Sequence, residues 1–177
     1  MTATTRCSNF LRTTVAVLAL GAAASAAQAV EMRGFRGVAW GEASVKLGEA
    51  TLVSQAGEVS CYQRNNENLL FGDSPVNNVR FCFKQDRLFL VSVESAQPAD
   101  ALAEEFTRTY GKPTRSSAGR SEWAAHRGQA QAEVMSQAPT GSALHVYSAG
   151  SQRKAVNQAL ALIAPAKAPV TIAYLAK

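Results

Sequence analysis

Histidine and cysteine are scarce in this chain, whose 177 residues include two histidines, His126 and His145, and three cysteines. A protein zinc site takes about four ligands, which commonly fall at C-x-x-C or H-x-x-x-H spacing. Neither spacing occurs here, and neither histidine has a second ligand paired with it. The sequence therefore predicts no metal site.

Motifs of common active sites are also missing. The chain has no G-x-S-x-G nucleophile turn, no phosphate-binding P-loop and no dinucleotide-binding G-x-G-x-x-G. Its acids form no pair suited to acid and base chemistry, because Glu104 and Glu105 point apart on a predicted helix, and Glu122 and Glu133 belong to separate predicted strands. We therefore predict a protein that is not an enzyme, with no catalytic residue and no cofactor.

No segment is apolar over the roughly 20 residues that a membrane-spanning helix requires. The apolar run TVAVLALGAAA is shorter, follows Arg6 and Arg12, and precedes the small residues SAAQA. This order is typical of a cleavable secretory signal. We predict a signal peptide over residues 1–29 with cleavage after Ala29, a single domain over residues 30–177, and a periplasmic location without a transmembrane segment.

Basic residues only slightly outnumber acidic ones. The chain has 18 Lys and Arg against 13 Asp and Glu, a formal net charge of +5, and loss of Arg6 and Arg12 with the signal lowers it to +3. The remaining arginines are scattered and show no interleaved aromatic pattern, unlike a nucleic-acid groove. We predict no nucleic-acid partner.

Alternating apolar residues and turn residues predict several short strands. These fall at residues 58–64, 67–71, 77–84, 87–95, 120–126, 130–137 and 142–149. The clearest pair is a hairpin in which NNVRFCFK and RLFLVSVES flank the turn QD. The tail PVTIAYLAK is predicted to form a last strand or to lie on the core.

Two helices are predicted between and after these strands. In QPADALAEEFTRTYGKP, Leu102, Phe106 and Tyr110 form one apolar stripe, and the Gly-Lys-Pro end stops the helix. A second helix begins at Ser151 and ends before Pro165. The order of elements predicts the α+β class, with antiparallel sheets of about six or seven strands packed by two main helices.

Cys61 and Cys82 are the cysteines that remain after Cys7 leaves with the signal. Both fall in predicted strands that can be neighbours, and an exported protein folds where disulfides persist. We therefore predict a Cys61–Cys82 disulfide. Two alternatives stay open: a metal clip, which needs further ligands, and a cysteine nucleophile, which needs a histidine beside a thiolate.

The large aromatic residues serve either a core or a partner surface. Phe81, Phe83 and Phe89 are predicted to share one face of the hairpin, beneath the first predicted helix. Trp40 and Trp123 are each flanked by small or polar residues. As the alternative to a place in the core, we consider both tryptophans candidates for an exposed partner surface.

The segments FRGVAWGEA, YGKPT and SEW resemble a loose family of small exported proteobacterial proteins, which share an early Trp-Gly pair and a helix ending in YGKP. The matching positions are Phe35, Gly37, Trp40, Gly41, Tyr110, Gly111, Pro113 and Trp123. The layout is also similar to periplasmic α+β domains that bind other proteins, such as outer-membrane assembly lipoproteins and β-lactamase inhibitor proteins. The resemblance implies a fold and supplies no catalytic residue.

These observations lead to three functional hypotheses. The first is a non-enzymatic periplasmic domain that binds an envelope protein or peptide. The second is a protein that binds a small molecule or cell-wall fragment between helix and sheet, with an arginine holding an anionic group. The third is an enzyme that uses Cys61 or Cys82 together with a histidine.

Overall fold

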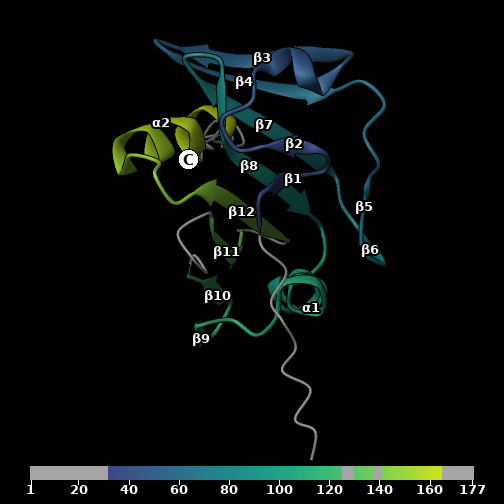
Figure 1. Cartoon of the computed structure of the whole chain (residues 1–177). Coiled ribbons are helices and arrows are strands. Elements are labelled where there is room, and N and C mark those ends of the chain that lie inside the picture. Colours follow the sequence, from purple (N-terminus) through teal and green to yellow (C-terminus); the bar gives the residue numbers. More distant parts are fainter. Residues whose placement is uncertain (1–31, 125–129, 138–140, 165–177) are drawn as a thin grey trace, which may run out of the picture.

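The structure of the protein is a computed structural model that describes residues 32–124, 130–137 and 141–164 (Figure 1). The predicted signal peptide, His126 and the predicted tail strand lie outside these residues. Among the described residues, no helix has both the length and the apolar character needed to cross a bilayer.

One antiparallel sheet dominates the fold. Its strand order is β3-β4-β7-β8-β12-β11-β10-β9 (Figure 1). The bounds are Ala50–Ala56 (β3), Val59–Arg64 (β4), Asn78–Lys84 (β7), Arg87–Ser95 (β8), Arg115–Ser117 (β9), Arg120–Trp123 (β10), Ala130–Ser136 (β11) and Ser142–Ser148 (β12). The α+β class with an antiparallel sheet and two α-helices is therefore confirmed.

The predicted number of six or seven strands is wrong, because the main sheet has eight strands. Strands β3 and β9 were not predicted, since most of their side chains are exposed and leave no apolar alternation in the sequence. The predicted strand at residues 67–71 belongs instead to a separate small hairpin. The described residues form two such hairpins: β1 (Gly34–Phe35) pairs with β2 (Val38–Ala39), and β5 (Leu70–Phe71) pairs with β6 (Ser74–Pro75). A short 3₁₀ helix, η1 (Ser44–Leu47), follows the first hairpin.

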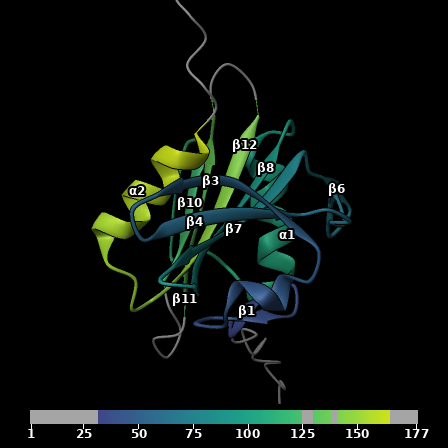
Figure 2. The ribbon, with the colours of Figure 1, turned by 90° about the horizontal axis from the view of Figure 1, so that it is seen from above.

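The two helices pack on opposite faces of the sheet (Figure 2). Helix α1 (Ala99–Tyr110) lies against β11 and β12, and its residues Leu102 and Phe106 are fully buried. Helix α2 (Arg153–Ile163) lies against β3, β4 and β7, and buries Val156. The central strands therefore contact apolar side chains on both sides.

The β7–β8 hairpin forms as predicted, with one difference in how its side chains point. Gln85 and Asp86 both take positive φ angles of 51° and 57°, as a two-residue hairpin turn requires. Cys82 pairs with Leu90 and Phe83 pairs with Leu88, so a bulge intervenes at Phe89.

The prediction that Phe89 shares a face with Phe81 and Phe83 is wrong. Leu88 is the partner of Phe83, so the alternation of side chains alone points Phe89 to the opposite face, and the extra residue of the bulge places Leu90 on that face as well. Phe81 and Phe83 pack in the α1 cluster, whereas Phe89 packs with Cys82 on the α2 side.

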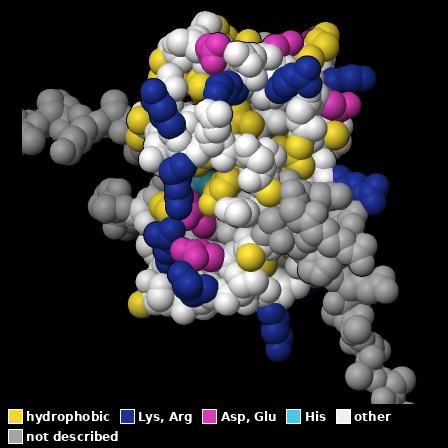
Figure 3. Space-filling model, turned by 60° about the vertical axis from the view of Figure 1, so that its left-hand side comes forward, with side chains coloured by type: hydrophobic (Ala, Val, Ile, Leu, Met, Phe, Trp, Pro, Cys, Tyr) yellow, Lys and Arg dark blue, Asp and Glu magenta, His cyan; other side chains and the backbone are white. Residues whose placement is uncertain are grey.

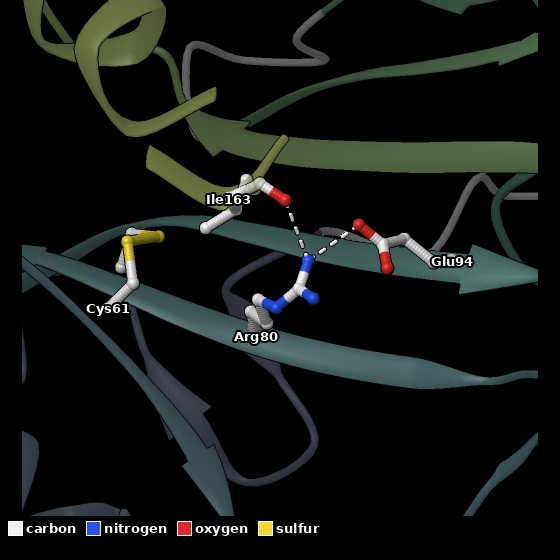
Figure 4. Close-up of a disulfide and its surroundings, with 5 residues drawn as sticks. Cys61, Arg80, Glu94 and Ile163 are labelled. Carbon is white, nitrogen blue, oxygen red and sulfur yellow. Dashed lines mark hydrogen bonds and ion pairs between the residues drawn. A yellow bond between two sulfur atoms is a disulfide. The ribbon is translucent and has the colours of Figure 1, made fainter. Parts of the chain in front are cut away.

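The predicted Cys61–Cys82 disulfide is confirmed. The two cysteines face each other directly across β4 and β7, with their Cα atoms 4.1 Å apart, and both are fully buried in the α2 cluster. Nearby, the Arg80 Nη1 atom donates to Glu94 Oε1 at 2.6 Å and to the Ile163 carbonyl at 2.9 Å (Figure 4). The disulfide and Arg80 thus fix the two strands beneath α2 and the end of the helix.

Reduction of this disulfide should lower stability. The bridge closes a loop between residues 21 apart in sequence, and a loop of that size stabilises the folded state by about 3 kcal/mol in the chain-entropy model. Urea unfolding with and without dithiothreitol should show a loss of this size. The Cys61→Ala/Cys82→Ala variant is the control, because its stability should not respond to the reductant. Uptake of two alkyl groups by the unreduced protein would contradict the bridge.

Candidate functional site

Strand β3 forms one edge of the main sheet and has no strand on its outer side among the residues described. An edge strand leaves a row of backbone N–H and C=O groups unpaired, and charged residues or proline commonly protect it from further pairing. The β3 sequence, ATLVSQA, contains neither. The opposite edge strand, β9, has only three residues and carries the exposed Arg115. Strand β3 is therefore the more open edge.

Strand β3 carries exposed apolar side chains. Leu52 and Val53 lie on β3, and the register of the β3–β4 ladder shifts between Leu52 and Ser54. Within the described ranges, every exposed large hydrophobic residue lies between positions 45 and 70: Val45, Leu52, Val53, Leu69 and Leu70. Of these, Leu52 and Val53 place apolar contact area beside the unpaired backbone of β3.

A cavity of about 430 Å³ opens where the loop after β2, the β7–β8 turn and the start of α2 meet. Its walls include Trp40, Lys84, Arg87 and Phe89. The Trp40 indole N–H donates to the Met32 carbonyl at 2.7 Å, which fixes the orientation of the ring. Trp40, predicted as part of a partner surface, is therefore a half-buried wall of a cavity.

Trp123 lies in the core, which does not fit a role on an exposed partner surface. Its side chain is 4% exposed, and its indole N–H donates to the Gly111 carbonyl at 2.8 Å. Its ring also meets Phe106 edge to face, with centroids 4.7 Å apart. The small and polar neighbours of Trp123 in sequence misled the prediction. Successive side chains of a strand point to opposite faces, so the exposure of a neighbour says nothing about the exposure of the tryptophan.

Three residues of types found in hydrolase sites line up on the α2 side of the sheet. His145 on β12 is directly opposite Ser92 on β8 and Glu133 on β11, and all three are buried. The sequence did not indicate this alignment, because it depends on the pairing of β12 with β8, which lies far from β12 along the chain.

The hydrogen bonds of a nucleophile, base and acid are not formed there. Among the residues that the structure describes, neither Ser92 Oγ nor His145 Nδ1 has a hydrogen-bond partner, and Glu133 instead accepts from Arg120 at 2.7 Å. Activation of a serine needs the base within hydrogen-bond reach, with the acid orienting that base. The alignment therefore lacks the contacts that would make it a catalytic triad.

Charges of both signs surround Tyr147, close to the aligned residues Ser92, His145 and Glu133. A second cavity, of about 210 Å³, is lined by Arg120, Glu122, Glu133, Tyr147 and Arg153, among others. Arg120 pairs with Glu122 at 2.9 Å and with Glu133 at 2.7 Å. Burial, and then the Glu133 carboxylate, raise the pKa of Tyr147. On the face drawn in Figure 3, Lys and Arg side chains run down one side with Asp and Glu side chains among them. The acids offset the arginines, which argues against a strongly anionic ligand here.

The disulfide decides the role of the two cysteines. Because Cys61 and Cys82 are bonded to each other, neither sulfur is a thiolate available for metal binding or nucleophilic attack. Over the ranges 32–124, 130–137 and 141–164, no group of three or more His, Cys, Asp or Glu side chains could hold a metal ion.

Comparisons with known proteins found no relative from which to transfer a function. A scan against protein-family models, a search of curated proteins and a search of solved structures each gave no match. The candidate sites therefore rest on the geometry above.

His145 should make stability depend on pH. Burial lowers its pKa from 6.5 to about 4, so the folded protein binds the proton less readily than the unfolded chain. The resulting stability is present above pH 6.5 and is lost as the pH falls towards 4. One pKa unit corresponds to about 1.4 kcal/mol, so the loss between pH 7.5 and 4.5 should be about 2 to 3 kcal/mol.

The His145→Gln variant tests this dependence, because glutamine does not ionise. Urea unfolding at pH 7.5, 5.5 and 4.5 gives the difference in free energy of unfolding between the wild-type protein and the variant. The titration of carboxylates is common to both proteins and cancels in this difference. The wild-type protein should lose more stability than the variant on acidification. Parallel losses in the two proteins would rule out the proposed effect of His145.

Proposed function

We propose that this chain is an exported, non-enzymatic binding domain that holds an extended segment of an envelope protein or peptide against strand β3. The observation that carries the proposal is the seven-residue β3 edge, which has no charged residue and no proline. Export is supported by the signal-like start of the sequence, and the disulfide is compatible with an oxidising compartment.

Pairing along an edge strand explains how such a domain could bind without a deep pocket. An added strand forms main-chain hydrogen bonds with the edge, and its alternate side chains meet the surface on each face of the sheet. Leu52 and Val53 would supply apolar contacts to such a strand. The expected partner segment is therefore extended, carries apolar residues in alternate positions and lacks proline at the pairing positions.

The fixed position of β3 favours this mode of binding. Helix α2 supports the strand from one side, since the Gln158 side chain donates to the Ala56 carbonyl at 2.9 Å. Strand β4, to which β3 pairs, is joined to β7 by the disulfide. An edge that is already ordered loses little conformational entropy when a partner pairs with it.

A charge placed on β3 should weaken partner binding. A photo-crosslinking amino acid at the exposed Gln55 is expected to capture partner peptides in the envelope fraction, and mass spectrometry would identify the joined residues. The Leu52→Lys variant should reduce this capture by about tenfold or more, which corresponds to about 1.4 kcal/mol of binding free energy, because an edge lysine opposes strand pairing.

Leu69→Lys is the matched control, because Leu52 and Leu69 are both 46% exposed and only Leu52 lies on β3. It should leave capture at Gln55 unchanged. Equal losses in the two variants would indicate a general effect of surface charge and would contradict pairing along β3. Capture at Gln55 no greater than at the exposed Lys112 would contradict it as well.

A further inference from the structure

The cavity beside Trp40 combines an apolar wall with two positive side chains. Trp40, Phe89 and Ala155 supply its apolar lining, and the hydrogen bond from the Trp40 indole N–H to the Met32 carbonyl fixes that ring. At about 430 Å³, the cavity falls in the size range of small-molecule sites.

The two positive side chains at this cavity are weakly engaged by the protein. Arg87 is exposed and makes no hydrogen bond or ion pair with the residues that the structure describes. Within the described ranges, the Lys84 side chain donates only to the neutral side chain of Gln152, at 3.2 Å. A guanidinium without a protein partner can give all its N–H donors to a ligand.

No acidic residue is among the described residues that line the cavity, so none there offsets these charges. Asp86, between Lys84 and Arg87 in sequence, accepts a hydrogen bond from the Ser44 backbone N–H at 2.9 Å and is not part of the wall. The mixed-charge cavity around Tyr147 differs, because there two glutamates stand beside the arginines. The Trp40 cavity therefore favours a ligand of negative charge.

The start of α2 adds to this preference. The helix begins at Arg153, next to the cavity residues Ser151 and Gln152, and has neither a side-chain cap nor an acidic residue in its first turn. Free N–H groups at a helix start carry partial positive charge. This contribution supplements Lys84 and Arg87.

We propose that the Trp40 cavity binds a small amphipathic anion, with its apolar body against Trp40 and Phe89 and its carboxylate or phosphate between Lys84 and Arg87. Apolar contact and charge pairing must act together in this site, because its wall is apolar and its rim is basic. The inference does not depend on peptide pairing at β3, which involves a different edge of the molecule.

Three probes separate these contributions: octanoate, its neutral amide octanamide, and inorganic phosphate. Trp40 and Trp123 are the two tryptophans of the chain, so two-dimensional NMR can follow their indole N–H signals separately. Octanoate should shift the Trp40 signal and leave the buried Trp123 signal nearly unchanged. Octanamide and phosphate should each bind at least about tenfold more weakly, since each lacks one of the two interactions.

The Arg87→Gln variant should weaken octanoate binding by about tenfold, as expected for losing a charge-assisted hydrogen bond. It should remain folded, because Arg87 has no described partner to lose. Lys112→Gln removes one positive charge from an exposed position at the end of α1 and should leave octanoate affinity unchanged.

Several results would overturn the proposal. They are an unshifted Trp40 signal at millimolar octanoate, equal affinity for octanoate and octanamide, full affinity for phosphate alone, and equal losses in Arg87→Gln and Lys112→Gln. The Leu52→Lys variant keeps this test separate from peptide binding, because it should leave octanoate affinity unchanged. A failure at one surface would therefore not decide the other.

Discussion

The packing of α1 and α2 on opposite faces of one sheet is the constraint on which the rest of the fold depends. Strand β8 lies at the centre of this arrangement, and seven of its nine residues are buried. A strand covered on both faces must be apolar at consecutive positions. The bulge at Phe89 adapts β8 to this requirement, because it places both Phe89 and Leu90 in the α2 cluster and directs Val91 towards the α1 cluster.

The α2 face is held by covalent and polar contacts as well as by apolar packing. The disulfide joins β4 to β7 beneath the helix, and Arg80 connects β7 to Glu94 of β8 and to the last residue of α2. Burial of a charged pair is favourable only when its hydrogen bonds are satisfied, and Arg80 meets this condition through two acceptors. Both proposed binding surfaces therefore lie on a fixed framework: β3 pairs with β4, and the Trp40 cavity includes the start of α2.

Elements with a buried face could be predicted from the sequence, whereas those without one could not. The stripe of Leu102 and Phe106 and the alternation around the β7–β8 turn indicated α1 and the central hairpin. Strand β3 has mostly exposed side chains, so its pairing is set by backbone geometry that leaves no pattern of residue types. The Trp40 cavity was invisible for another reason: its walls come from three segments that only the folded chain brings together.

The positions that carry the family resemblance have structural roles. Gly41 takes a φ of 83°, a backbone conformation that favours glycine. Its N–H donates to the Leu88 carbonyl. Gly111 ends α1 at a φ of 86° and accepts the indole hydrogen bond of Trp123, while the Tyr110 ring packs at a tilt against Phe106. Leu52 and Arg87, on which the two proposed sites depend, are not among these positions. The resemblance therefore bears on the fold and carries no information on what this chain binds.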